Sequence, residues 1–173
     1  GLPLRERVRG KKKVVVISSD HTRPVPSRLL MPIILREIRT GNPEADISIL
    51  VATGCHRAPT KQELLDRYGE DIVAHERIVI HNAGDNDSLV DLGLMASGNR
   101  LLLNRVAYEA DFLMAEGFIE PHFFAGFSGG RKAVLPGVVG RATTMFNHCA
   151  ANIDNPGART GLLDHNPIHM DMC

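Results

Sequence analysis

The segment from residue 120 to residue 132 brings together groups that could bind and act on an anionic ligand. It reads Glu-Pro-His-Phe-Phe-Ala-Gly-Phe-Ser-Gly-Gly-Arg-Lys, and its chemistry-bearing residues are His122, Gly126, Ser128, Gly129, Gly130, Arg131 and Lys132. The glycines and the serine predict a loop whose backbone N–H groups can approach an anion closely, because glycine places no side chain in the way. A proton carrier precedes this loop, and an amine that could act as a nucleophile follows it. The segment therefore predicts a catalytic site built around a phosphorylated ligand.

The glycine loop differs from the P-loop of nucleoside triphosphatases. That motif needs Gly-Lys followed by Ser or Thr, whereas Lys132 lies between Arg131 and Ala133. One interpretation is a phosphate cradle of another type. The other is a flexible turn followed by a solvated basic pair.

Two histidines are candidate proton carriers. His56 and His122 each follow a predicted strand, and imidazole is the side chain best suited to move protons near neutral pH. Either histidine taken alone could be a surface or helix-capping residue. A reaction that inverts a stereocentre needs a proton carrier on each face of the substrate, and two opposed histidines would supply them.

A polar cluster, Asp-His-Thr-Arg-Pro at positions 20–24, follows the first predicted strand. Arg23 is a candidate carboxylate clamp, because a guanidinium can bind two oxygens at once. The alternative for Arg23 is a surface salt bridge. Asp20 could accept hydrogen bonds from ribose hydroxyls, as acids at strand ends do in dinucleotide folds, or it could cap the following turn.

His148, which stands beside Cys149, is a candidate metal ligand. No second protein ligand lies at zinc-like spacing from it. The alternative is an ordinary core or surface histidine.

Composition argues against several classes of function. Twenty acidic residues balance twenty basic ones, which gives no support to a nucleic-acid partner. No apolar run approaches the ~20 residues needed to cross a bilayer, so no membrane partner is expected. The cysteines, Cys55, Cys149 and Cys173, are widely spaced and include no Cys-x-x-Cys pair. We therefore expect a reducing, cytoplasmic environment.

The chain alternates predicted strands with predicted helices, which is typical of an α/β fold. Buried β-branched runs predict strands at 14–18, 47–52, 77–81 and 112–115. Helical patterns follow at 27–38 and from Thr60, where Glu63 would complete a capping box. We expect one cofactor-binding domain, residues 1–173, with a Rossmann-like, open, mainly parallel sheet and helices on both faces. The candidate residues follow the carboxyl ends of strands, where ligands bind in such sheets.

The remaining segments are less regular. Residues 82–100 predict a loop with a short strand near 89–92. A helix that holds Phe146, His148 and Cys149 is predicted after Arg141, and another at the end of the chain, with Pro167 in its first turn. Because a domain rarely ends on the opening of a helix, we expect the chain to be a fragment.

Five segments, in order, resemble the nickel-dependent lactate racemase family. They are Asp20 to Pro24, Thr53 to Arg57, Glu120 to Gly137, Phe146 to His148 and Asn166 to His169. The resemblance runs from about Val14 to the last residue. Five ordered segments are far more specific than any single motif.

The resemblance implies a nickel-pincer nucleotide, derived from nicotinic acid and joined to a lysine through a thioamide. By position, Lys132 matches the tether and His148 the histidine that ligates nickel, while the pincer supplies the other ligands. His56 and His122 match the acid/base pair. The other matches are Arg23 with the substrate-orienting arginine, and Asp20, Thr53, Ser128, Gly129, Gly130 and Arg131 with positions that bind the cofactor's ribose and phosphate.

The activity implied is that of an isomerase, a racemase or epimerase of a small 2-hydroxy acid such as lactate. The Cα–H of such an acid is a very poor proton donor, and hydride transfer avoids the carbanion. One histidine would take the hydroxyl proton while hydride moves to the pincer ring, and return of hydride to the other face would give the enantiomer. Accessory proteins that build the cofactor and insert nickel are the implied partners.

Members of this family are longer and carry a second domain that closes over the site, so the fragment alone is expected to be inactive. The alternative is a non-catalytic nucleotide- or phosphate-binding module that keeps the loop but never receives the cofactor. A metallohydrolase that uses the histidines as ligands ranks last, because their spacing matches no zinc pattern.

Overall fold

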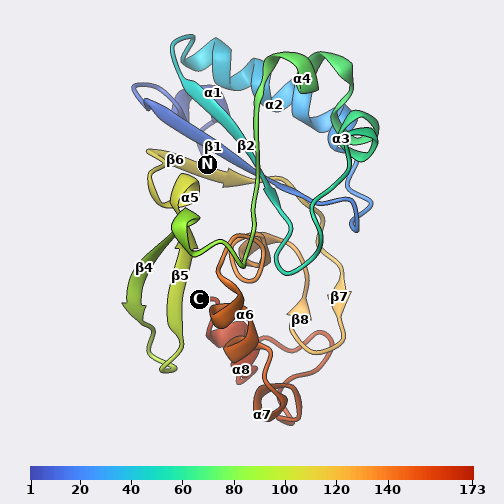
Figure 1. The fold of residues 1–173 in the computed structure, drawn as a ribbon, viewed down its shortest axis with the longest axis vertical. Coiled ribbons are helices and arrows are strands. Elements are labelled where there is room, and N and C mark those ends of the chain that lie inside the picture. Colours follow the sequence, from blue (N-terminus) through green and yellow to red (C-terminus); the bar gives the residue numbers. More distant parts are fainter.

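A four-stranded parallel sheet forms the centre of the upper half of the molecule (Figure 1). The computed structural model describes residues 1–173. The sheet has the order β3-β2-β1-β6, and its strands are β1 (Lys13–Ser19), β2 (Asp46–Ala52), β3 (Arg77–Ile80) and β6 (Phe112–Ala115). Every neighbouring pair is parallel, and Val14 of β1 is level with Ile47 of β2 and Phe112 of β6. The expected α/β class with a mainly parallel sheet is confirmed.

Alternate residues of the strands fill two separate cores, because successive side chains of a strand point to opposite faces. Val14 and Val16 pack under the helices of one face, whereas Val15 and Ile17 pack against the other. The first face is covered by α1 (Leu4–Arg7), α2 (Ser27–Gly41), α3 (Lys61–Tyr68) and α4 (Glu70–His75). The second is covered by the short α5 (Arg105–Tyr108), the 3₁₀ turn η2 (Gly130–Ala133) and residues 134–138. Helical segments therefore lie on both faces, and the longer ones lie on the first.

The two early helices follow their sequence signals closely. In α2, Met31, Leu35 and Ile38 are buried at the spacing of one helix face, and the helix runs three residues past the predicted end at Ile38. The predicted capping box of α3 is present: the Thr60 side chain accepts from the Glu63 N–H, and the Glu63 carboxylate accepts from the Thr60 N–H.

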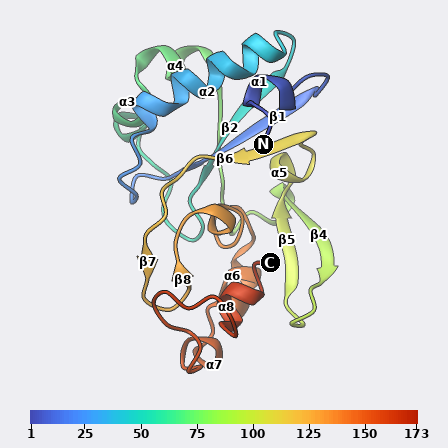
Figure 2. The ribbon, with the colours of Figure 1, turned by 180° about the vertical axis from the view of Figure 1, so that it is seen from behind.

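Residues 82–104 are more ordered than the sequence indicates. The turn η1 (Asn86–Ser88) leads into an antiparallel hairpin of β4 (Leu89–Leu94) and β5 (Arg100–Asn104). The short strand near 89–92 is thus confirmed within β4, whereas β5, which begins where the predicted loop ends, was not predicted. The hairpin lies beside the carboxyl edge of the sheet (Figures 1 and 2).

The last third of the chain lies below that edge in both views (Figures 1 and 2). It holds β7 (Pro121–His122), β8 (Gly126–Phe127), α6 (Arg141–Asn147), α7 (Ala150–Ile153) and α8 (Pro167–Met170). Pro167 occupies the first turn of α8, as predicted, and the Asn166 side chain caps it. The helix after Arg141 is confirmed but is shorter than predicted: His148 is its capping residue and Cys149 lies outside it. This lower part has its own small core of Ala125, Ala158 and Ile168.

None of the helices combines the length and the apolar character that crossing a membrane would require.

Candidate functional site

One cavity of about 400 Å³ at the carboxyl edge of the sheet collects nearly all the predicted site residues. Its lining includes Asp20, Arg23, Thr53, His56, His122, Ser128, Gly129, Gly130, Lys132 and His148. These residues come from loops that follow β1 and β2 and from the segment after β6, which are far apart in sequence. Parallel strands place such loops at one edge, which is why the fold joins them.

Arg131 is the predicted site residue that does not line this cavity. Its guanidinium donates to the carbonyl of Ala125 at 3.4 Å, and its Nε is buried without a partner in the protein. Burial lowers the pKa of this guanidinium, and the nearby Cys173 opposes that effect. The Arg131 side chain thus contacts the lower part of the molecule, whereas the neighbouring Lys132 lines the cavity.

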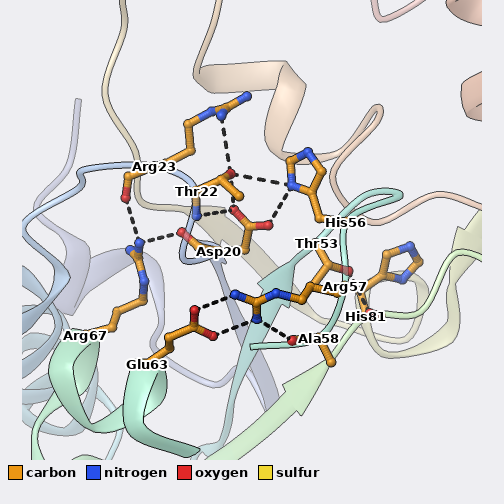
Figure 3. Close-up of polar contacts among 10 residues, drawn as sticks. All are labelled: Asp20, Thr22, Arg23, Thr53, His56, Arg57, Ala58, Glu63, Arg67 and His81. Carbon is orange, nitrogen blue, oxygen red and sulfur yellow. Dashed lines mark hydrogen bonds and ion pairs between the residues drawn. The ribbon is translucent and has the colours of Figure 1, made fainter. Parts of the chain in front are cut away.

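His56 is held by a buried carboxylate (Figure 3). Its Nδ1 lies 2.7 Å from Oδ2 of Asp20, whose side chain is 2% exposed. The other oxygen of Asp20 accepts from the N–H and the hydroxyl of Thr22, at 3.0 and 2.6 Å. Burial by itself would raise the pKa of Asp20, but hydrogen bonds from Thr22 and His56 outweigh it and lower that pKa. The ionised carboxylate therefore fixes the orientation of the His56 ring.

Arg67 shapes the loop that carries Asp20 and Arg23 (Figure 3). It donates to the backbone carbonyls of both residues, at 2.6 Å in the case of Arg23, and to the Ser27 hydroxyl at 2.9 Å. The Arg23 guanidinium donates only to the Thr22 hydroxyl, at 3.3 Å, and forms no ion pair. A surface salt bridge was the alternative role for Arg23, and the structure does not form it. Arg23 therefore keeps donors for a ligand in the cavity.

The loop that carries His56 is fixed at both ends (Figure 3). At its start, the Thr53 hydroxyl donates to the carbonyl of His81 at 2.7 Å. At its end, Arg57 donates to both carboxylate oxygens of Glu63, at 2.8 and 2.6 Å. The Thr53 hydroxyl is therefore committed to the protein, although the residue lines the cavity.

Some glycines of the loop are required by close packing, and another has free space beside it. Gly126 and Gly129 have φ of +79° and +77°, and a Cβ on either would collide with a backbone oxygen, of Leu162 and Phe118 respectively. Gly130 has φ of +54° and open space where a Cβ would lie. The Ser128 N–H donates to the Glu120 carbonyl, whereas the N–H groups of Gly129 and Gly130 have no acceptor in the protein. These two N–H groups are the ones that an anion could use.

Lys132 and His122 lie close together, and their surroundings favour the uncharged form of each side chain. The N–H groups of Phe124 and Ala125 point at Nδ1 of His122, at 3.5 and 3.3 Å, so the neutral ring carries its hydrogen on Nε2. That Nε2 lies 3.4 Å from Nζ of Lys132. Burial and the charge of Lys132 lower the pKa of His122 to about 4. Burial and the charge of Arg23 lower the pKa of Lys132 to about 8.

Phe124 contacts His122, His148 and Lys132 in this part of the cavity. Its ring meets those of His122 and His148 edge to face, with centroids 4.5 and 5.1 Å away, and Nζ of Lys132 lies 5.6 Å from its centroid. Burial together with the charge of Lys132 lowers the pKa of His148 to about 4, although the backbone of Thr144 opposes the shift. The neutral imidazole is the form that ligates metals.

Glu116 is a cavity residue that the sequence analysis missed. It directly follows β6, so its place after a predicted strand could have identified it. Nothing comparable in the sequence identifies Arg67, which donates to the backbone carbonyls of Asp20 and Arg23.

Protein side chains alone do not assemble a metal centre here, since no group of three or more His, Cys, Asp or Glu residues could hold an ion. The metallohydrolase alternative therefore lacks a ligand set. A metal held by His148 would need most of its ligands from another molecule.

Relatives of known name match the whole length of the chain. The lactate racemase of Thermoanaerobacterium thermosaccharolyticum is 52% identical over 169 residues, covering 98% of this chain and 40% of the relative. That of Lactiplantibacillus plantarum is 57% identical over 169 residues, with the same coverage of 98% and 40%. The chain thus spans about 40% of the length of these curated relatives.

Solved structures give the same result for the fold. The lactate racemase apoprotein from Thermoanaerobacterium thermosaccharolyticum superposes with a TM-score of 0.97 at 51% identity, covering 99% of this chain and 41% of that one. A Thermotoga maritima protein superposes with a TM-score of 0.80 at 24% identity, covering 98% of this chain and 45% of that one. The second likeness bears on the fold alone.

The family model described as the lactate racemase N-terminal domain matches residues 2–161. This match includes four of the five segments from which the resemblance was read, and the two relatives align over 98% of the chain, so the resemblance is confirmed. The chain belongs to the lactate racemase N-terminal domain family.

Proposed function

We propose that this chain is the cofactor-binding part of an isomerase that racemises lactate or a similar small 2-hydroxy acid. The observation that carries the proposal is the convergence of Arg23, His56, His122, Lys132 and His148 on one cavity. The named relatives are lactate racemases, which supports the same activity.

The residues present fit a nickel-pincer nucleotide. Lys132 would hold it through a thioamide, since a lysine of pKa about 8 is partly a neutral, nucleophilic amine at neutral pH. His148, a neutral imidazole that lines the cavity, would ligate the nickel. The N–H groups of Gly129 and Gly130 would bind the phosphate. When bound, the cofactor would accept hydride from the substrate Cα and return it.

The protein's own groups would orient the substrate and move its proton. The Arg23 guanidinium would bind the substrate carboxylate through two parallel hydrogen bonds. His56, oriented by Asp20, would take the hydroxyl proton of one enantiomer. His122 would serve the other enantiomer, and its lowered pKa keeps the ring neutral, with the hydrogen on Nε2 available for a bond to the substrate oxygen.

Accessory proteins that synthesise the cofactor and insert nickel would be the partners of this chain. A reducing cytoplasm would suit them, and it would suit the cysteines, which are all free thiols. No nucleic-acid or membrane partner is proposed.

The second candidate function is a non-catalytic nucleotide- or phosphate-binding module. It is favoured by a specific observation: the free N–H groups of Gly129 and Gly130 could bind phosphate without any nickel or tether.

Intact mass and nickel content of the full-length protein separate the two candidates. The protein would be produced together with the cofactor-building enzymes. We expect an added mass on Lys132 and bound nickel, with Lys132→Ala losing both and His148→Ala losing the nickel. The exposed residues Lys61 and His75 provide the control variants Lys61→Ala and His75→Ala, which should keep both. A wild-type protein with no adduct and no nickel would leave only the binding module.

A further inference from the structure

The hydroxyl of Thr22 is a contact point shared by three residues of the site (Figure 3). Thr22 lines the cavity and lies on the loop that follows β1. Its hydroxyl donates to Oδ1 of Asp20 at 2.6 Å and accepts from Nη1 of Arg23 at 3.3 Å. The same oxygen lies 3.5 Å from Nδ1 of His56. Thr22 thus lies between the proposed carboxylate clamp and the proposed base.

The hydrogen-bonding capacity of this hydroxyl matches its neighbours. A hydroxyl has one hydrogen and two lone pairs. An ionised carboxylate can only accept, so the hydrogen points to Asp20, and a guanidinium can only donate, so one lone pair faces Arg23. The second lone pair is left for the longer contact with His56, whose Nδ1 also lies 2.7 Å from Asp20. The hydroxyl therefore links the guanidinium to the Asp20–His56 pair.

This link is the only hydrogen bond that holds the tip of Arg23 to the protein. The Arg23 backbone is fixed separately, since its carbonyl accepts from Arg67 at 2.6 Å. An arginine side chain has many rotamers and stays in one of them only where contacts offset the lost conformational entropy. Without the Thr22 hydroxyl, the guanidinium would therefore be free to move relative to His56, although the loop backbone would keep its place.

The separation of Arg23 and His56 determines which hydroxy acids can engage both. In the proposed reaction the guanidinium binds the carboxylate of the substrate, and His56 takes the hydrogen of its hydroxyl. These two groups stand on adjacent carbons in a 2-hydroxy acid, whereas a 3-hydroxy acid has one more methylene between them. Both protein groups lie within 3.5 Å of one oxygen, so their close spacing suits the shorter acid. A misplacement of about 1 Å at such a site is enough to slow a reaction strongly.

We propose that the Thr22 hydroxyl fixes the distance between the Arg23 clamp and the His56 base, and thereby selects 2-hydroxy acids over 3-hydroxy acids. The proposal rests on the proposed function. It makes Thr22 a positioning residue, because its hydroxyl acts through Arg23 and Asp20. The Thr22 N–H also donates to Oδ1 of Asp20, at 3.0 Å, so Thr22→Val would keep this turn and lose only the hydroxyl contacts.

Inhibition of the loaded full-length enzyme by two achiral acids, glycolate and 3-hydroxypropionate, tests the proposal. Glycolate carries its hydroxyl on the carbon next to the carboxylate, and 3-hydroxypropionate carries it one carbon further away. The inhibition constant of each acid would be measured against lactate racemisation, and calorimetric titration gives the same ratio where turnover is too slow. The wild-type enzyme is expected to bind glycolate at least about tenfold more tightly, because only glycolate can engage both groups at once.

Three variants separate positioning from a purely structural role. Thr22→Val should bring the ratio of the two inhibition constants close to one and lower kcat for lactate. Thr22→Ser keeps the hydroxyl and should retain most of the wild-type ratio. The control is Thr40→Val: Thr40 is exposed on α2 and donates only to the Arg36 carbonyl, so neither the ratio nor kcat should change. A general loss of loop structure would weaken the binding of both acids together and leave their ratio unchanged.

The remaining outcomes also decide the matter. A wild-type ratio near one would overturn the proposal without any variant. An unchanged ratio in Thr22→Val, with lactate still racemised by the wild type, would overturn the role of Thr22 and leave the proposed function standing. A wild-type enzyme that carries the adduct and nickel but does not racemise lactate would overturn both. If Thr22→Val fails to fold, Thr22→Ala takes its place and should show the same loss of selectivity.

Discussion

Nδ1 of His56 lies 2.7 Å from Oδ2 of the buried Asp20, so the two side chains form an oriented pair at the cavity wall. The lowered pKa of Asp20 keeps its carboxylate ionised at neutral pH, where it accepts the hydrogen on Nδ1. The tautomer that results leaves Nε2 of His56 without a hydrogen and able to accept one from a substrate. Asp20 is thus a positioning residue for the proposed base.

Replacement of Asp20 by asparagine tests this pairing. An amide has the same shape but no charge, and it does not favour one tautomer of His56. We expect kcat of the loaded full-length enzyme to fall on the order of 100-fold or more, with a shifted acidic limb of the pH profile and little change in KM. Racemisation would be followed from each enantiomer.

Asp46→Asn is the control for that experiment, since Asp46 is exposed and pairs only loosely with Arg77, at 3.8 Å. It should leave the pH profile unchanged. An Asp20→Asn enzyme with the wild-type profile would show that His56 does not depend on the carboxylate.

The amine of Lys132 should be reactive at a lower pH than an ordinary lysine. Its pKa is about 8, because burial, Arg23 and Arg131 all disfavour the charged form. Labelling of the apoprotein with a small acylating reagent, followed by peptide mapping, should therefore show a midpoint near pH 8, against about 10.4 for a lysine in a free peptide. A midpoint near the free-peptide value would contradict the burial argument.

The same shift predicts how stability depends on pH. The folded-state pKa of Lys132 lies below its unfolded value, so the unfolded chain binds more protons between pH 8 and about 10.4. This residue's contribution to the free energy of unfolding should therefore rise with pH across that window. Lys132→Met should flatten the rise in urea titrations of the apoprotein, and an unchanged slope would contradict the assignment.

The sequence predicted most of the framework, for reasons visible in particular elements. Val14, Ile17 and Ile49 belong to short β-branched runs, which are typical of a parallel sheet covered on both faces. The capping box at Thr60 and the proline at position 167 act locally, so they needed no knowledge of the tertiary fold. Strand β5 was missed because its side chains are half-buried in a hairpin beside the sheet and do not alternate clearly.

The site was predictable to the extent that strand ends determine it. His56 and Asp20 follow β2 and β1, and the parallel arrangement brings them together. The direction of each side chain could not be predicted in this way. Arg131 and Lys132 are neighbours in sequence, yet only Lys132 lines the cavity. Arg67 acts from α3 on a loop 44 residues earlier, a contact that follows only from how α3 packs.

Arg67 should be required for the shape of the loop that carries Asp20 and Arg23. Its guanidinium donates to two backbone carbonyls and one hydroxyl, which lysine cannot reproduce because it lacks the planar fork. We expect Arg67→Lys to lower the free energy of unfolding by roughly 2 kcal/mol and to speed hydrogen exchange in residues 20–23. Arg39→Lys, at a surface ion pair with Glu76, is the control and should change neither quantity appreciably. Unaltered exchange in Arg67→Lys would show that the loop keeps its shape without these bonds.

Gly129 and Gly130 should respond differently to alanine, although they are adjacent and both have positive φ. A methyl group on Gly129 would collide with the Phe118 carbonyl oxygen, so Gly129→Ala should lower the melting temperature strongly or prevent folding. A methyl group on Gly130 meets open space in the cavity, so Gly130→Ala should cost only about 1 kcal/mol for its backbone conformation. That methyl would stand where an anion must approach the N–H groups, and affinity for nicotinic acid mononucleotide should fall at least about tenfold. Thermal unfolding and calorimetry separate the two effects. A Gly130→Ala protein with wild-type affinity would mean that the phosphate does not bind at this loop.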